Sequence, residues 1–137
     1  MRIELGYPDH QAERQLLIGQ NRHQLCELLP VQLPPVQLQR IQQAVTQVHV
    51  SAALLDYCQG IIKYTRESSE YHCGLSPRAG LALLTAAKAW AFMDRRDAVI
   101  PEDIQAVLAA VAGHRLRAGS TQSEAIVAPI LANVAVH

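Results

Sequence analysis

The most restrictive feature of the sequence is the stretch from Ser76 to Ala91, which predicts one long helix that is apolar on nearly every side. Ser76 is a favourable N-cap residue, and Pro77 suits the first helical position. Apolar side chains then follow with little polar interruption, at Leu81, Leu83, Leu84, Ala87, Trp90 and Ala91. A helix of this kind has no wide polar face, so we expect it in the middle of a helical bundle.

Other stretches predict the helices that would surround it. Apolar residues at helical spacing, N-cap residues and first-turn prolines indicate helices over about 8–17, 35–48, 52–66 and 101–112. The stretch 21–35 reads as a loop with one turn of helix near 25–28, and the tail 120–136 fits either a helix or an extended segment. Residues 2–5 alternate as a short strand does. The predicted fold is all-α, a small bundle of four to six helices with short strand segments allowed at its edges.

The composition excludes several classes of protein. The chain has 137 residues, half of them apolar, which suits one domain with a real core. Twelve basic residues balance twelve acidic ones, so no broad electrostatic surface for nucleic acid is expected. Three widely spaced cysteines without a Cys-x-x-Cys pair indicate reduced thiols in the cytoplasm. No apolar run approaches the ~18 residues of a membrane span, and none is expected.

Arg78 is the residue that raises a functional question. It lies in the first turn of the predicted helix, where unpaired backbone N–H groups and the macrodipole disfavour a cation by about 0.3–1 kcal/mol. An arginine combined with a helix N-terminus can bind an anion, and its planar fork matches phosphate oxygens. Two alternatives stay open: Arg78 pairs with Glu67 or Glu70 of the preceding loop, or it points into solvent.

No other pattern in the chain completes an active site. The sequence lacks the G-x-x-x-x-G-K-[ST] loop that cradles nucleotide phosphates, and it lacks an apolar strand ending in paired acids for magnesium. The histidines show no metal-binding spacing, so no metal site is expected. Cys58 is interpreted as a small core residue and Cys73 as a loop thiol without an activating base.

Two motifs at a fixed separation resemble a known family. The first is Gly74-Leu75-Ser76-Pro77-Arg78-Ala79 with its Leu/Ala-rich helix, and the second is Arg96-Asp97-Ala98-Val99-Ile100-Pro101-Glu102-Asp103-Ile104, followed by His114-Arg115-Leu116. With Leu5-Gly6-Tyr7-Pro8-Asp9, Val48-His49-Val50-Ser51 and Tyr64-Thr65-Arg66, they resemble the C-terminal lid of MoxR-type AAA+ ATPases over nearly the whole chain.

The resemblance implies a role for each matched site residue. Arg78 corresponds to the sensor 2 arginine, which contacts the γ-phosphate of ATP, and Ser76 and Pro77 present it. Tyr7 and Pro8, at the junction between ATPase core and lid, are also expected beside the nucleotide. ATP and Mg²⁺ would be bound mainly by the core. The family implies chaperone-like remodelling of a client complex, ring assembly, often hexameric, and partners with a von Willebrand factor A domain.

The resemblance also implies a domain division. Residues 1–8 would be the end of an ATPase core and its hinge, and residues 9–137 the helical lid. The core motifs lie outside this sequence, so the chain alone is not expected to hydrolyse ATP. The alternative, from another class, is a stand-alone helical module that binds a protein partner and no nucleotide.

Overall fold

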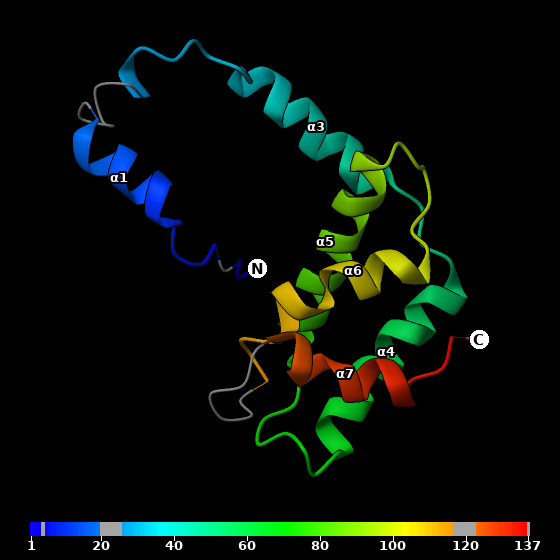
Figure 1. The fold of residues 1–137 in the computed structure, drawn as a ribbon. Helices are drawn as coiled ribbons and strands as arrows, with labels where there is room; N and C mark the ends of the chain where they lie inside the picture. The colour runs from blue at the N-terminus through cyan, green and yellow to red at the C-terminus, as the bar shows by residue number, and fades with distance from the viewer. Residues whose placement is uncertain (4, 20–25, 117–122, 137) are drawn as a thin grey trace.

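The fold is all-α, as the sequence predicts. The computed structural model describes residues 1–3, 5–19, 26–116 and 123–136. Within these ranges the helices are α1 (His10–Ile18), α3 (Pro35–Gln47), α4 (Ala52–Glu67), α5 (Pro77–Met93), α6 (Pro101–Ala112) and α7 (Ser123–Asn133). Figure 1 shows α4 to α7 gathered into a bundle, with α3 reaching the far end of α5 and α1 standing apart.

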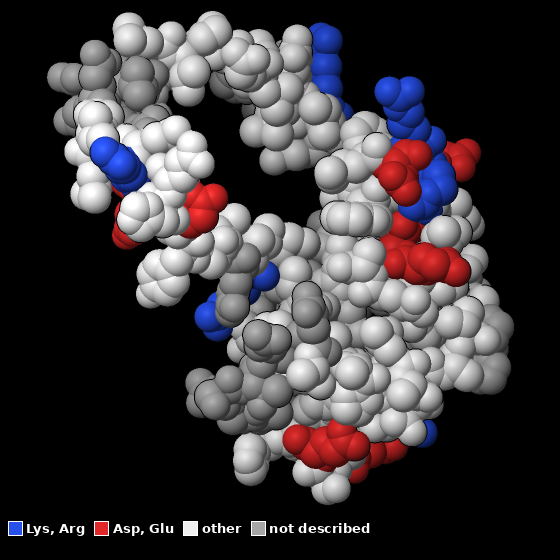
Figure 2. Space-filling view, viewed as in Figure 1, with Lys and Arg blue, Asp and Glu red and all other residues white. Residues whose placement is uncertain are grey.

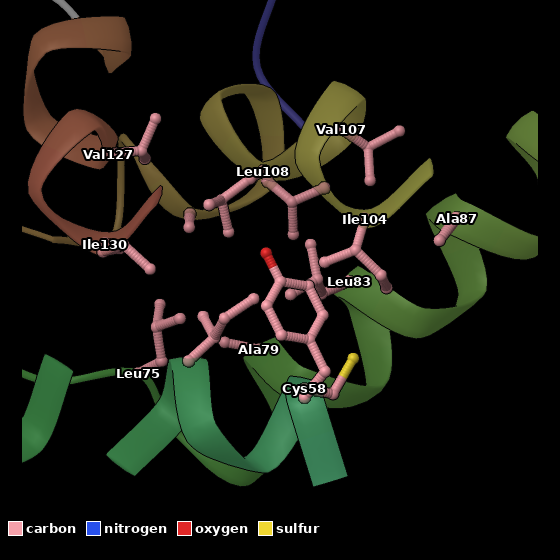
Figure 3. Close-up of a cluster of buried hydrophobic side chains, with 14 of the residues drawn as sticks. Cys58, Leu75, Ala79, Leu83, Ala87, Ile104, Val107, Leu108, Val127 and Ile130 are labelled. Carbon is pink, nitrogen blue, oxygen red and sulfur yellow. The ribbon is translucent and has the colours of Figure 1, made fainter. Parts of the chain in front are cut away.

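Helix α5 contributes a stripe of small and medium side chains to the core. Ala79, Leu83, Ala87 and Ala91 repeat every four residues, which places them on one helix face, and all are buried. Figure 3 shows Ala79, Leu83 and Ala87 of this stripe on the side of α5 that faces α6. Helix α5 packs against α3, α4 and α6, which confirms its expected position among several helices. Helix α5 is nevertheless not covered all round, because Leu81, Trp90 and Met93 are exposed.

A short backbone pairing joins the entries of α4 and α6. The N–H of His49 donates to the carbonyl of Asp97 at 2.7 Å, and the N–H of Val99 donates to the carbonyl of His49 at 3.0 Å. These bonds form an isolated parallel bridge between His49 and Ala98. Among the described residues this single bridge is the β-type pairing that the structure shows, and it is shorter than the edge strand segments that the sequence allowed.

An ion pair fixes the turn between α5 and α6. Asp103 in the first turn of α6 is almost fully buried, and its carboxylate accepts from Arg96 Nη1 at 2.7 Å and from Arg96 Nη2 at 2.5 Å. It also accepts from the backbone N–H of Ile100 at 2.9 Å. These hydrogen bonds hold the pKa of the Asp103 carboxyl below its usual range. In Figure 2, acidic and basic side chains lie together where α5 leads into α6.

The N-terminal arm, residues 1–47, contributes no buried residue among those described. Helix α1 packs against no other described helix, and α3 packs only against α5. Lys88 ties the end of α3 to the bundle, since its Nζ donates to the carbonyl of Thr46 at 2.9 Å. Figures 1 and 2 show the arm arching outward between the N-terminus, which lies beside the bundle, and the end of α3. Its apolar side chains, such as Leu17 and Ile18, remain exposed.

Two details at the N-terminus differ from the sequence predictions. No strand forms at residues 1–3 or at Leu5; instead the N–H of Arg2 donates to the carbonyl of Ala110 in α6 at 2.7 Å. A strand needs a neighbouring strand, and the described residues offer none there. Helix α1 begins at His10 rather than at Pro8, because the carboxylate of Asp9 caps it by accepting from the N–H of Ala12 at 2.7 Å.

The two segments without a firm prediction are partly described. Cys26 and Glu27 are helical, in agreement with the predicted turn, while the rest of that loop's start, residues 20–25, lies outside the described residues. In the tail, α7 shows that the helical alternative is correct for Ser123–Asn133. Residues 117–122 lie outside the description. Ile126, Val127 and Ile130 of α7 are buried, so packing of α7 against α6 decides the ambiguity.

Candidate functional site

The start of α5 has the capped geometry that the sequence predicts. Ser76 is extended, with φ −74° and ψ 162°, and its hydroxyl accepts from the N–H of Ala79 at 3.2 Å. Its carbonyl accepts from the N–H groups of Ala79 and Gly80. Pro77 fills the first helical position, where no N–H is needed. Arg78 follows at the second position, so its direction is set by a capped and ring-restricted turn.

Arg78 carries a free positive charge at this helix start. The residue is exposed, and within the described parts of the chain it forms no ion pair and no side-chain hydrogen bond. Neither Glu67 nor Glu70 pairs with it, so the first alternative for Arg78 is not what the structure shows. Its guanidinium and the positive end of α5 together favour an anion at this place.

Tyr7 and Pro8 lie in the segment that leads into α1. Tyr7 is fully exposed, and Pro8 is also exposed. No hydrogen bond or ion pair among the described residues joins either one to Ser76 or Arg78. The structure therefore brings Ser76, Pro77 and Arg78 together, while a common site with Tyr7 and Pro8 stays a prediction.

The end of α4 holds the residue just before the cap. The Thr65 hydroxyl accepts from the N–H of Leu75 at 3.0 Å, and Arg66 Nε donates to the carbonyl of Leu75 at 2.9 Å. Sequence reasoning assigned Thr65 and Arg66 no task, because they lie nine or more positions before their partner. The one available signal was their place in the motif Tyr64-Thr65-Arg66.

A groove with a volume of about 860 Å³ runs beside this site, between α4 and α5. Its walls combine apolar side chains, including Leu55, Ile62 and Leu81, with Arg66 and Pro77 at the end nearest the cap. Cys58 reaches it from the core side. Burial raises the pKa of the Cys58 thiol to about 11, so the thiol is neutral near pH 7 and is an unreactive core group.

Two other features are absent from the residues that the structure describes. Within the ranges given above, no three His, Cys, Asp or Glu residues cluster closely enough to hold a metal ion. In the same part of the chain, no helix combines the length and the apolarity needed to cross a bilayer.

The sequence profile of the AAA lid domain family matches residues 63–130, a range that begins near the end of α4 and includes the capped start of α5. Residues 63–130 belong to the AAA lid domain family. The resemblance recognised from the motifs is confirmed, and the Ser-Pro-Arg and Pro-Glu-Asp segments both fall inside the matched range.

Similar proteins place this AAA lid domain among MoxR-like proteins. The chain is 30% identical to YeaC of Bacillus subtilis over 141 residues, covering 98% of the chain and 44% of YeaC. It is 31% identical to the chaperone MoxR1 of Mycobacterium tuberculosis over 126 residues, covering 84% of the chain and 32% of MoxR1. A 43-residue stretch is 49% identical to the protein MoxR of Paracoccus denitrificans, 31% of the chain and 13% of that protein. The chain thus spans less than half the length of these relatives.

A solved structure has the same fold. The crystal structure of a candidate ATPase from Cytophaga hutchinsonii matches the whole chain with a TM-score of 0.75 and 26% sequence identity. The match covers 46% of that protein. The lid fold, including the arm, therefore has a counterpart within a longer protein.

Proposed function

We propose that this AAA lid domain senses the γ-phosphate of ATP through Arg78 and couples ATP hydrolysis to the remodelling of a client complex. The observation that carries the proposal is the unpaired guanidinium of Arg78 at the capped start of α5. A buried or ion-paired arginine could not reach a ligand held by another domain. An exposed arginine at a proline-fixed helix start can do so, and loss of the γ-phosphate would remove its partner.

The residues of the lid suit part of an ATP site. Arg78 offers a planar set of N–H donors, which fits phosphate oxygens. The Ser76 hydroxyl is already used by the N–H of Ala79, so it serves the cap. Among the described residues near this cap, no cluster of acids offers a place for Mg²⁺. Mg²⁺ and the remaining phosphate contacts would thus be supplied by an ATPase core, where the metal neutralises phosphate charge.

The assembly that follows from this proposal is a ring. AAA+ ATPases of this family work as rings, and a lid that closes on ATP and opens on ADP would pass the state of one subunit to the next. We extend the proposal to a hexameric ring, to a partner with a von Willebrand factor A domain, and to chaperone-like action on a client. Its support is the similarity to MoxR proteins, one of which is named a chaperone.

The test uses the complete gene product and compares Arg78→Ala with Arg40→Ala. Arg40 is an exposed arginine on α3, and α3 meets α5 near Lys88, about 15 Å along the helix from Arg78. We expect Arg78→Ala to lower kcat for ATP hydrolysis about ten- to a hundredfold, the range for losing a charged hydrogen bond. It should also bring the affinities for ATP and ADP closer together. Arg40→Ala should retain wild-type kinetics.

Unchanged hydrolysis and nucleotide preference in Arg78→Ala would contradict the sensor role and favour the stand-alone interaction module. Calorimetry on the 137-residue chain tests a different premise of the proposal, namely that the chain forms no nucleotide site by itself. Because the sequence has no phosphate-binding loop, the chain alone should bind ATP weakly. A tight stoichiometric complex would mean that the chain contains a nucleotide site that this proposal does not describe.

A further inference from the structure

The segment before Arg78 is held by the end of α4 through both backbone groups of a single residue. The N–H of Leu75 donates to Thr65 Oγ1 at 3.0 Å, and its carbonyl accepts from Arg66 Nε at 2.9 Å. Leu75 is also buried, and its side chain enters the core on the side of Ile130, as Figure 3 shows. The peptide groups on either side of Leu75 are therefore fixed against α4.

The hydroxyl of Thr65 is itself fixed. Thr65 is only 1% exposed, and its Oγ1 donates to the carbonyl of Ile62 at 2.8 Å, which leaves a lone pair aimed at Leu75. A buried N–H without an acceptor costs about 1–3 kcal/mol, so this contact resists opening. Thr65 thus connects the last turn of α4 to the entry of α5 through one oriented hydroxyl.

Gly74 allows the backbone to come this close. A Cβ added at Gly74 would lie 2.6 Å from Arg66 Cγ, 2.7 Å from Arg66 Cα and 2.8 Å from the carbonyl oxygen of Thr65. Two of these atoms belong to the backbone of α4 and cannot turn aside as a side chain would. The loop therefore lies directly against α4, at a distance that only glycine permits.

Little freedom remains between Leu75 and Arg78. Ser76 is held by its cap, and the ring of Pro77 fixes its own φ near −65°. Leu75 is bound to α4, Ser76 caps α5, and Pro77 restricts the backbone between Ser76 and Arg78. This series of three residues consequently sets the position of the Arg78 backbone relative to α4. Within the described residues the Arg78 side chain makes no ion pair and no hydrogen bond, so the path of the backbone through this series and the packing of α5 place it.

We propose that Thr65 and Arg66 are positioning residues that hold Leu75 and thereby aim Arg78 at the γ-phosphate. The inference rests on the proposed function, because it presumes that Arg78 meets ATP. A misplacement of about 1 Å can cost about a hundredfold in rate, so loosening Leu75 should affect turnover. In this proposal the ATPase core, rather than the lid, makes most of the contacts with bound ATP. The KM for ATP should therefore change less than kcat.

The first test is a double-mutant cycle on the complete gene product, with Thr65→Val, Arg78→Ala and their combination. Valine keeps the shape of threonine and removes the hydroxyl. We expect Thr65→Val to lower kcat about tenfold, with KM for ATP changed by less than about twofold. In the Arg78→Ala background it should have no further effect, because the residue that it positions is gone. Thr65→Ser, which keeps the hydroxyl, should retain kcat within about twofold.

The cycle separates the two proposals. If Arg78→Ala lowers kcat and Thr65→Val lowers it by the same factor again in the double variant, Thr65 acts independently and the positioning role is wrong. If Thr65→Val leaves kcat unchanged while Arg78→Ala lowers it, the positioning role is also wrong and the sensor role stands. If Arg78→Ala itself has no effect, both proposals are overturned.

A second pair of variants covers the case in which Thr65→Val does not fold. Arg66→Lys keeps the positive charge of this exposed side chain. It removes the Nε–H group that donates to the carbonyl of Leu75. Its matched control is Lys63→Arg, the reverse exchange three residues earlier on α4. We expect kcat to fall about threefold in Arg66→Lys and to stay unchanged in Lys63→Arg. Equal kinetics in both variants would overturn the role of Arg66.

A third measurement uses the 137-residue chain alone and does not depend on ATP. In Arg66→Lys and in Thr65→Val, hydrogen exchange at the Leu75 amide should become at least about tenfold faster, while exchange at Leu108 in α6 stays as in the wild type. A Leu75 amide that already exchanges freely in the wild type would show that the end of α4 does not hold it.

Discussion

The N-terminal arm, with α1 and α3, and the bundle of α4 to α7 are both built from helices. They bury very different numbers of side chains. Helices α1 and α3 are amphipathic, and neither contains a buried residue. Helices α4, α5 and α6 each bury four or more residues, including Leu54, Leu83 and Leu108. An apolar stripe therefore specifies a helix in both regions, but it creates a core only where a second layer faces it.

The largest expected effect comes from removing a core side chain from the bundle. Leu83 is 0% exposed, so Leu83→Ala should lower the free energy of unfolding by about 3–4 kcal/mol. The matched change in the arm is Leu17→Ala, at a residue that is 83% exposed, and it should cost less than about 0.5 kcal/mol. Urea unfolding measures both. A large loss for Leu17→Ala would mean that the arm is packed in solution.

The next largest effect concerns the ion pair between α5 and α6. Asp103→Asn keeps the shape but loses the charge that Arg96 needs, and we expect a loss of about 3 kcal/mol, at the low end for a broken buried pair because Arg96 is partly exposed. Asp94→Asn is the control, since Asp94 meets the same arginine at 3.2 Å but is largely exposed. It should cost little. Similar losses of unfolding free energy in both variants would show that the burial of Asp103 does not strengthen its pairing with Arg96.

The same pair predicts an acid dependence. Because the folded-state pKa of Asp103 lies below the ordinary 3.8, its charge stabilises the fold fully above that pH. This stability is lost as the pH falls through the lower folded-state pKa. The difference in unfolding free energy between wild type and Asp103→Asn should therefore be constant from pH 7 to about 5 and shrink below pH 4. A difference that does not shrink would exclude Asp103 ionisation as its source.

A smaller effect is expected where a loop meets α7. The Tyr71 hydroxyl donates to the carbonyl of Ile126 at 2.8 Å, and Tyr71→Phe should cost about 1 kcal/mol near pH 7. Burial, aided by the charge of Glu70, raises the pKa of Tyr71 from 10.0 to about 12. The neutral form is thus favoured by folding, and its contribution is lost as the pH rises from 10 to 12. The curves for wild type and Tyr71→Phe should converge there; parallel curves would contradict this.

The smallest effect on stability is expected at the candidate site itself. Arg78 is exposed and has no side-chain partner among the described residues, so Arg78→Ala should leave the thermal unfolding midpoint of the chain unchanged. The same substitution should strongly impair hydrolysis by the complete gene product. A lowered midpoint would instead indicate that Arg78 supports the bundle, in the manner of Asp103.

The capped start of α5 and the buried ion pair of Asp103 also differ in how far the sequence could predict them. The start of α5 was predictable because Ser76 and Pro77 act within one turn of helix. The first-turn position of Asp103 was predictable for the same reason. Its burial against Arg96 was not, because the sequence alone does not show how the turn between α5 and α6 folds back. The exposure of Leu81 and Met93 in α5 was not predicted, because an apolar sequence does not reveal how many neighbours a helix has.

The sequence by itself determined the helices before α7, the motif pair and the place of Arg78 in the first turn of α5, because caps and periodicity depend on residues within about four positions. Tertiary structure alone decided that α7 is a helix, that α1 packs against no other described helix, and that Thr65 and Arg66 hold Leu75. These outcomes depend on contacts between residues nine or more positions apart, which form only when the chain closes its loops and buries apolar surface.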